Sequence, residues 1–575
     1  PAVNFIKGSV TTYFQSQAAN FDSIVFDMSS VLLVDSVIYH AAPVNFTHVG
    51  ETVNISLPAN IPVASMDSVA VYYHGAPANT GFGSFIQDNH NGHPIIWTLS
   101  EPYGSSDWWP CKNGLTDKAD SIDIYVSTPV DNKVASNGVL TEEIPNGADK
   151  IYHWKHRYPI AAYLICFSTT NYIRYSHWVP FNGDTLEFVN YIYPEDSVAS
   201  SLQSPSVISM IQLYDTLFGV YPFQNEKYGH AEFGWGGGME HQTITFIGGF
   251  GFELFAHELA HHWFGDKITC ASWEDIWLNE GFATYLSGLS YEHLQPQYWM
   301  QFKQSHIQSV TSQPNGSVFC DDTSTVWRIF DGRLTYNKGA MILHQLRWIL
   351  GDSAFFAAMN SYLTDANCAY GFAHTSDFKN HLETAGGQNL TWYFDDWFSG
   401  QGYPSYALTW TKAGNTVNFT LNQSQSDPSV SFFEMPVPIQ FKNGTQDTII
   451  RFANTFSGQS FSANLSFSPT SVVLDPDYWL ITANNSIVAG THELNDAAQF
   501  QLYPNPAQQE IRIDLGEKPA KEIKIEVMDL LGQKLIYSSI STSKKIINIE
   551  ALEAGMYFVR LNNGTATSIK SFSKQ

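Results

Sequence analysis

The stretch Gly251–Tyr285 reads GFELFAHELAHHWFGDKITCASWEDIWLNEGFATY. It holds three histidines within six residues, His257, His261 and His262, and eighteen residues separate His261 from Glu280. Because His257 and His261 are four positions apart, a helix would place both imidazoles on one face, one turn apart. Two imidazoles at that spacing can share one metal ion, and zinc prefers nitrogen and carboxylate donors. The stretch therefore predicts a zinc site.

Two glutamates complete this predicted site. Glu258 follows the first ligand directly, where it can take a proton from a metal-activated water. The patterns on both sides of GDKITCASWED are helical, so a second helix carrying WLNEGFATY could direct Glu280 at the same ion, with Thr284 one turn further as a hydrogen-bond partner. An H-E-x-x-H match can arise by chance in a histidine-rich core helix. The position of Glu280 favours the metal site, and His262 is predicted to be a bystander.

Four sequence blocks together resemble the zinc metallopeptidases of family M1, the gluzincin aminopeptidases that include aminopeptidase N and leukotriene A4 hydrolase. Two of these blocks, HELAHHWFGD and WLNEGFATY, belong to the stretch quoted above. GWGGGMEH (Gly234–His241) resembles the family's G-x-M-E-N motif, and YNKGAMILHQLRWILGD (Tyr336–Asp352) resembles the block that holds its catalytic tyrosine. A further block, TLSEPYGSSDWWPC, resembles the family's N-terminal substrate-binding segment. The blocks occur in the family's order and spacing.

The resemblance implies a catalytic role for each matching residue. His257, His261 and Glu280 would bind one zinc ion, and Glu258 would be the general base. Tyr336 would donate a hydrogen bond to the oxyanion that develops during hydrolysis.

The resemblance also implies how a peptide substrate with a free N-terminus is bound. Glu240 would bind its α-ammonium group, and Glu101 is a candidate second anchor, with a solvated strand-end carboxylate as the alternative. Met239 belongs to the same motif, and Gly237 and Gly238 would let the backbone approach the substrate closely. A blocked amine would leave Glu240 unpaired, so the implied activity is removal of the first residue of a peptide.

The sequence departs from the family pattern at four positions. His241 stands where the G-x-M-E-N motif has asparagine, and Leu99 stands where the N-terminal segment has glutamine. His262 and Asp266 differ in the zinc-helix block. None of these removes a proposed ligand or catalytic group, but Leu99 and His241 are expected on the substrate side and bear on first-residue preference.

The patterns around these blocks predict a multidomain α+β protein. Residues 1–172 alternate like strands, typical of the family's saddle-shaped, β-sandwich-like N-terminal domain. From about Asn171 the chain is expected to be mostly helical, and the resemblance to family M1 implies that residues 173–402 form a thermolysin-like catalytic domain. Residues 403–486 are expected to form a β-sandwich in place of the family's large C-terminal helical domain. The polar stretch ANNSIVAGTHELNDAAQ is predicted to be a linker.

Residues 497–575 resemble a second family. FQLYPNPAQQEIRIDL, DLLGQKLI and GMYFVRLNNG occur there in order and look like the C-terminal sorting domain of the Bacteroidetes type IX secretion system, a small β-sandwich. The alternative is a carbohydrate- or surface-binding β-sandwich module. The sorting domain would imply export across the outer membrane to the cell surface or medium, with the secretion machinery as a partner.

The composition argues against some classes of binding partner and metal site. The 575 residues have a net charge of −25, which repels nucleic acid and anionic membrane surfaces. No apolar run approaches the ~18 residues of a membrane span. Five widely spaced cysteines without a C-x-x-C pair argue against a cysteine-based zinc site and permit one or two disulfides. The start at Pro1 fits a removed leader or a trimmed N-terminus.

Three alternative functions stay open beside a zinc aminopeptidase. Epoxide hydrolysis, as in leukotriene A4 hydrolase, uses the same motifs. A non-catalytic surface binding protein could use the same scaffold, although the presence of Glu258 and Tyr336 favours an enzyme. An endopeptidase is disfavoured by Glu240.

Overall fold

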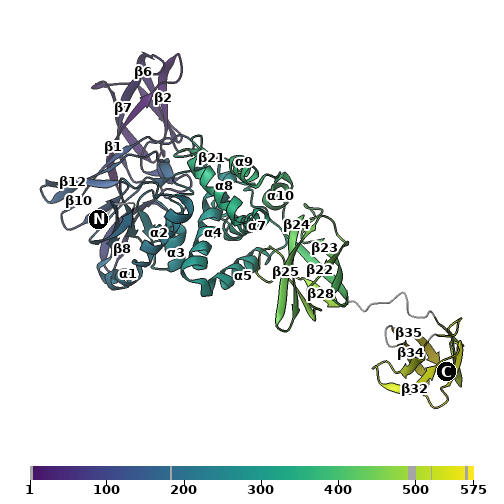
Figure 1. Ribbon diagram of the computed structural model, residues 1–575. Coiled ribbons are helices and arrows are strands. Elements are labelled where there is room, and N and C mark those ends of the chain that lie inside the picture. Colours follow the sequence, from purple (N-terminus) through teal and green to yellow (C-terminus); the bar gives the residue numbers. More distant parts are fainter. Residues whose placement is uncertain (1–3, 182–183, 490–499, 520, 564–566) are drawn as a thin grey trace. The chain divides into compact units, whose positions relative to one another are not determined.

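The computed structural model describes residues 4–181, 184–489, 500–519, 521–563 and 567–575 (Figure 1). The chain divides into two compact units. The first comprises Pro1–Ala407, Leu421–Gln459 and Ser471–Ser486, and the second comprises Leu408–Thr420, Ser460–Thr470 and Ile487–Gln575.

The first unit begins with a region built from strands. β1 (Ile6–Gln15) alternates half-buried and exposed side chains and pairs antiparallel with β7 (Met66–Gly75). Side chains from the sheets β1-β7-β3-β4 and β2-β6-β5 share one core, which includes Phe26, Leu32 and Val53. The remaining strands of the region are β2 (Phe21–Asp27), β3 (Leu32–Tyr39), β4 (Ala42–Pro43), β5 (Phe46–Val49), β6 (Thr52–Ile61), β8 (Ser84–His90), β9 (His93–Leu99), β10 (Ile122–Pro129), β11 (Lys133–Ser136), β12 (Val139–Asn146), β13 (Asp149–His156) and β14 (Phe167–Thr170). The expected N-terminal β architecture is confirmed.

A five-stranded sheet follows, where the sequence patterns predict a mostly helical segment. Its order is β15-β16-β17-β19-β18, with β18 at one edge. The strands are β15 (Ile173–Phe181), β16 (Asp184–Ile192), β17 (Tyr228–Glu232), β18 (Gly238–Met239) and β19 (Thr245–Ile247). β17 is buried along its whole length and β18 and β19 are very short, so the last three strands lack the alternation that marks a half-buried strand. The mostly helical part of the chain therefore begins at Ser197, later than the boundary that the sequence predicts at about Asn171.

Helices make up most of the chain from Ser197 to Ser399. α4 is its central helix, because every residue from Trp277 to Ser290 is buried, and α3 packs against it. Figure 1 labels both within the helical part of the first unit. The helices are α1 (Ser197–Gln203), α2 (Ser206–Phe218), α3 (Phe252–Ala260), α4 (Trp277–Leu294), α5 (Trp299–Val310), α6 (Val326–Ile329), α7 (Gly339–Leu350), α8 (Asp352–Thr364), α9 (Thr375–Gly386) and α10 (Thr391–Phe394), with π-helical segments η6 (Gly332–Lys338) and η7 (Asp395–Ser399) and short strands β20 (Thr269–Cys270) and β21 (Phe372–Ala373).

Strands return after Gly402, as the sequence predicts. They are β22 (Pro404–Ala413), β23 (Thr416–Gln425), β24 (Met435–Asn443), β25 (Gln446–Asn454), β26 (Gln459–Asn464), β27 (Ser471–Leu474) and β28 (Ser486–Ala489). β24 and β25 form the hairpin that the Asn-Gly pair predicts, with Gly444 at φ 58°. β24 also pairs with β27 in the first unit.

The C-terminal strands of the second unit form two sheets, β29-β30-β33 and β32-β31-β34-β35. They share a core that includes Ile511, Ile525, Val559 and Phe572. The strands are β29 (Gln501–Tyr503), β30 (Glu510–Asp514), β31 (Ile523–Met528), β32 (Lys534–Ile540), β33 (Lys544–Asn548), β34 (Gly555–Asn562) and β35 (Thr567–Lys574). Residues 490–499, which include most of the predicted linker, lie outside the described residues.

Two further expectations concern cysteines and membranes. All five cysteines are buried and free. In the described ranges, no helix is both long enough and apolar enough to cross a membrane.

Candidate metal centre and substrate site

Three side chains from α3, α4 and the residue that follows α3 converge on one point. His257 Nε2 lies 3.1 Å from Glu280 Oε2 and 3.1 Å from His261 Nε2, and His261 Nε2 lies 3.4 Å from Glu280 Oε2. His261 caps α3 with helical backbone angles, so the four-residue spacing places both imidazoles on one side. The predicted ligand set is therefore brought together.

The spacing of these donors fits a zinc ion. Donors arranged tetrahedrally at ~2.0–2.1 Å from zinc stand ~3.3–3.4 Å from one another. The three observed separations lie close to that value, and a carboxylate with two imidazoles is a donor set that zinc favours. Glu280 and His261 are almost fully buried, whereas the His257 side chain is 16% exposed.

The electrostatic surroundings favour a cation between these donors. Burial alone would lower the pKa of His261, but the carboxylates of Glu240 and Glu280 outweigh it and raise this pKa to about 10. Burial would likewise raise the pKa of Glu280, yet His261 and His257 lower it to about 2. The carboxylates thus stabilise positive charge at the point where the donors meet.

Each of the two imidazoles makes a further contact through its other ring nitrogen, and this contact orients the ring. His261 Nδ1 lies 3.2 Å from the Phe264 carbonyl oxygen, and Thr284 Oγ1 lies 3.5 Å from His257 Nδ1. In metal sites, such contacts set which ring nitrogen faces the metal.

Three more glutamates surround the donors and leave carboxylate oxygens unpaired. Glu101, Glu240 and Glu258 are at most 5% exposed, and each has one buried oxygen without a hydrogen-bond partner in the described part of the chain. Ligand atoms of Glu240 and Glu258 cluster within 4.8 Å with His261, and those of Glu101 and Glu240 do so with Glu280. Burial raises the pKa of Glu240 to about 7, and burial together with the Glu240 carboxylate raises that of Glu101 well above its usual range. A bound cation would supply the missing partner.

Tyr336 lies beside the donor set on η6, a π-helical segment of a kind often found at functional sites. Its ring is stacked against that of His257, with 5.8 Å between centroids. Burial and the carboxylate of Glu280 raise the pKa of Tyr336 well above its usual range. The phenol is therefore neutral and able to donate a hydrogen bond.

The glycine-rich segment passes directly beside Glu258. A Cβ on Gly238 would lie 2.3 Å from Glu258 Oε1, so a side chain there would collide with the carboxylate. A Cβ on Gly237 would lie equally close to the ring of Trp235, and Met239 is buried. Among the described strands, β18 pairs only with β19 and lies at the edge of its sheet, so an extended peptide could pair along its other side.

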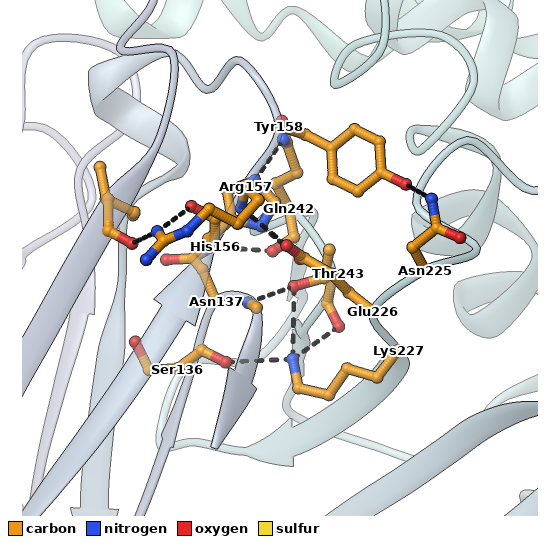
Figure 2. Close-up of polar contacts among 12 residues, drawn as sticks. Ser136, Asn137, His156, Arg157, Tyr158, Asn225, Glu226, Lys227, Gln242 and Thr243 are labelled. Atoms are coloured by element: carbon orange, nitrogen blue, oxygen red, sulfur yellow. Dashed lines mark hydrogen bonds and ion pairs between the residues drawn. The ribbon is translucent and has the colours of Figure 1, made fainter. Parts of the chain in front are cut away.

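Thr243, three residues past Glu240, is held in a strained conformation. Its φ of 70° is unusual for a β-branched residue and costs of order 1–3 kcal/mol. Three parts of the chain hold it there. Its N–H donates to His262 Nε2, its Oγ1 accepts from the Gly138 N–H, and its carbonyl accepts from Lys227 Nζ. Figure 2 shows the Lys227 ammonium directed at Thr243.

The neighbouring Gln242 is fixed by residues of the N-terminal β region. Asn137 Nδ2 donates to its carbonyl at 2.8 Å, and its side-chain amide donates to His156 Nε2 at 2.7 Å (Figure 2). His156 Nδ1 contacts the Glu226 carboxylate in turn. The roles of these residues could not be predicted from the sequence, because a buried polar residue carries no local signal of its distant partner.

Positions that depart from the family pattern are also buried. Leu99 is 1% exposed and His241 is fully buried with its ring edge-on to Phe246. Burial lowers the pKa of His241 to about 3, so its ring is neutral. His262 lies outside the donor set, and its buried ring accepts a hydrogen bond from the Thr243 N–H.

Comparison with known proteins gives two family matches. Residues 251–397 match the peptidase family M1 domain, and residues 501–575 match the secretion system C-terminal sorting domain. The chain is 32% identical over 197 residues to tricorn protease-interacting factor F2 of Thermoplasma volcanium, covering 32% of this chain and 24% of that protein. It is 30% identical over 227 residues to glutamyl aminopeptidase of Rattus norvegicus, covering 37% and 24%. The chain thus spans about a quarter of the length of these relatives.

A solved structure shares the fold. The M1 zinc metallopeptidase from Deinococcus radiodurans aligns with a TM-score of 0.60 and 23% identity, over 67% of this chain and 87% of that one.

Proposed function

Because this chain carries a peptidase family M1 domain and a secretion system C-terminal sorting domain, we propose that it is an exported zinc aminopeptidase. It would remove the N-terminal residue from peptides that have a free amine. The observation that carries the proposal concerns Glu101 and Glu240, which lie beside a zinc-like donor set. Each has one buried carboxylate oxygen without a hydrogen-bond partner among the described residues.

His257, His261 and Glu280 would hold one zinc ion. When bound, the ion supplies Lewis acidity, which makes water a nucleophile near neutral pH and polarises the scissile carbonyl. Thr284 and the Phe264 carbonyl hold the imidazoles in place.

Glu258 is the general base of the proposed reaction. Its carboxylate accepts the proton of the attacking water and then delivers it to the leaving nitrogen. Its position against Gly238 supports this role, since the substrate backbone can approach the carboxylate without a side chain in between.

Tyr336 stabilises the oxyanion that forms at the scissile carbonyl. Its neutral phenol donates a hydrogen bond where negative charge develops. Stacking against His257 holds the ring next to the donor set before substrate arrives.

Glu240 and Glu101 bind the substrate's α-ammonium group. The cation pairs two carboxylates that are otherwise buried with unpaired oxygens, so a free amine is strongly preferred over a neutral amide. An endopeptidase substrate would leave both carboxylates unpaired. A non-catalytic binding protein would not require Glu258 and Tyr336, and no feature of the site favours an epoxide substrate.

The C-terminal domain supports export. Residues 501–575 match a sorting domain, so we infer delivery to the cell surface or the medium through the secretion machinery. This segment forms two sheets around a core of its own, as expected for a sorting signal that is a domain separate from the catalytic part of the chain.

Removal of the metal tests the metal centre. Dialysis against a chelator is expected to abolish hydrolysis of aminoacyl p-nitroanilides, and about one zinc per chain is expected to restore it. Metal content and rate would be measured on the same samples. Full activity in protein stripped of metal would contradict the proposal.

A further inference from the structure

A cavity of about 660 Å³ opens beside the donor set. Its walls come from α3, α4, α5 and η6. His257 and Tyr336 form part of the lining, whereas Glu101, Met239 and Glu240 do not. The cavity therefore adjoins the reacting centre on a side other than that of the two amine-binding carboxylates.

The lining of the cavity contains one carboxylate and no lysine or arginine. Glu253, in the first turn of α3, is exposed, and its Oε2 accepts a hydrogen bond from Tyr291 at 3.1 Å. Leu254 and the Tyr336 ring offer apolar surface beside it. Thr284, Ser287, Ser309 and Asn337 add uncharged polar groups to the lining. Apolar surface next to a single carboxylate suits a lysine or arginine side chain, which combines an apolar stem with a cationic head.

A peptide bound by its amine at Glu240 and by its first carbonyl at the donor set must continue past His257 and Tyr336. Both residues line the cavity, so the side chain of the second substrate residue, which follows the scissile bond, would contact the cavity lining. Resting on the proposed function, we propose that the cavity receives the second residue of the substrate and that Glu253 selects a basic side chain there. The substrates are thus peptides with lysine or arginine at position two.

Tripeptides that differ only at position two test this selectivity. The first residue is the one cleaved best as an aminoacyl p-nitroanilide, the third is alanine, and kcat/KM for release of the first residue is measured. Lysine is expected to exceed glutamine by about 5-fold, the range of an ion pair that keeps part of its hydration, and glutamate is expected to be cleaved most slowly. The preference should shrink in high salt.

Glu253→Gln is expected to bring the lysine-to-glutamine ratio to about one, because the attraction is lost. Glu253→Lys should reverse the order of lysine and glutamate. Glu142→Gln, which makes the same change on the exposed face of β12 outside the cavity, is the matched control and should keep the preference. Ratios are taken within each variant, so a smaller folded fraction does not alter them. They also separate substrate selection from the stabilising effect of Glu253 on the α3 N-terminus, which acts on all substrates alike.

Two outcomes would overturn the inference: equal rates for lysine and glutamine in the unmodified protein, or a preference that persists in Glu253→Gln. The p-nitroanilides have no second residue, so they report the proposed function separately. If the unmodified protein fails to cleave the p-nitroanilides, the proposed aminopeptidase activity is wrong. If it cleaves them without any preference among the tripeptides, only the inference about Glu253 fails.

Discussion

Glu258→Gln is expected to lower kcat by about 10³-fold, within the range that a positioned general base contributes. The amide has the shape of the carboxylate but cannot accept the proton of the attacking water. Zinc content should stay at the level of the unmodified protein, because Glu258 lies outside the donor set of His257, His261 and Glu280. Steady-state rates and metal content, measured on the same preparation, check both statements.

Folding of the Glu258→Gln protein is not expected to suffer. One buried oxygen of this carboxylate has no partner in the described ranges, and replacing a buried charge with a neutral amide removes a desolvation cost. Thermal unfolding with bound zinc should therefore match the unmodified protein. A variant with normal zinc content and a kcat within about tenfold of the unmodified enzyme would show that another group moves the proton.

Glu240→Gln is expected to lower kcat/KM for free-amine substrates by about 10²- to 10³-fold, the effect of breaking a buried ion pair. The ammonium would then face Glu101 alone, beside an amide that cannot neutralise it. Progress curves with one peptide over a range of concentrations measure this loss.

The matched control for this prediction is Glu101→Gln. The same change removes the second carboxylate, and the loss is expected to be smaller than for Glu240→Gln, because Glu240 still pairs the amine. Equal activity of Glu240→Gln and the unmodified protein would mean that the amine is bound elsewhere.

The grouping of His257, His261 and Glu280 could be predicted from the sequence because its signals are local. The four-residue spacing of His257 and His261 becomes a shared face as soon as α3 forms. Glu280 lies on a second helix, α4, so its place beside the two histidines also depends on the packing of α3 on α4. The N-terminal strands are predicted for the same reason, since alternation along β1 follows directly from one buried face.

Features that depend on distant pairings could not be predicted from local patterns. β17 lies inside the five-stranded sheet and β19 has only three residues, so neither carries an alternating pattern. The strained backbone of Thr243 is held by Lys227, Gly138 and His262, which are distant along the chain. Only the folded chain brings these partners together, and with them it fixes the segment that follows Glu240.

The most direct test of the central claim compares one peptide with its N-acetylated form. Acetylation removes the positive charge that Glu240 and Glu101 are proposed to pair, and leaves the scissile bond and the second residue unchanged. With a free amine, the unmodified enzyme is expected to release the first residue at least about 10²-fold faster, the effect of leaving a buried carboxylate unpaired. Equal rates for the two forms would contradict an aminopeptidase.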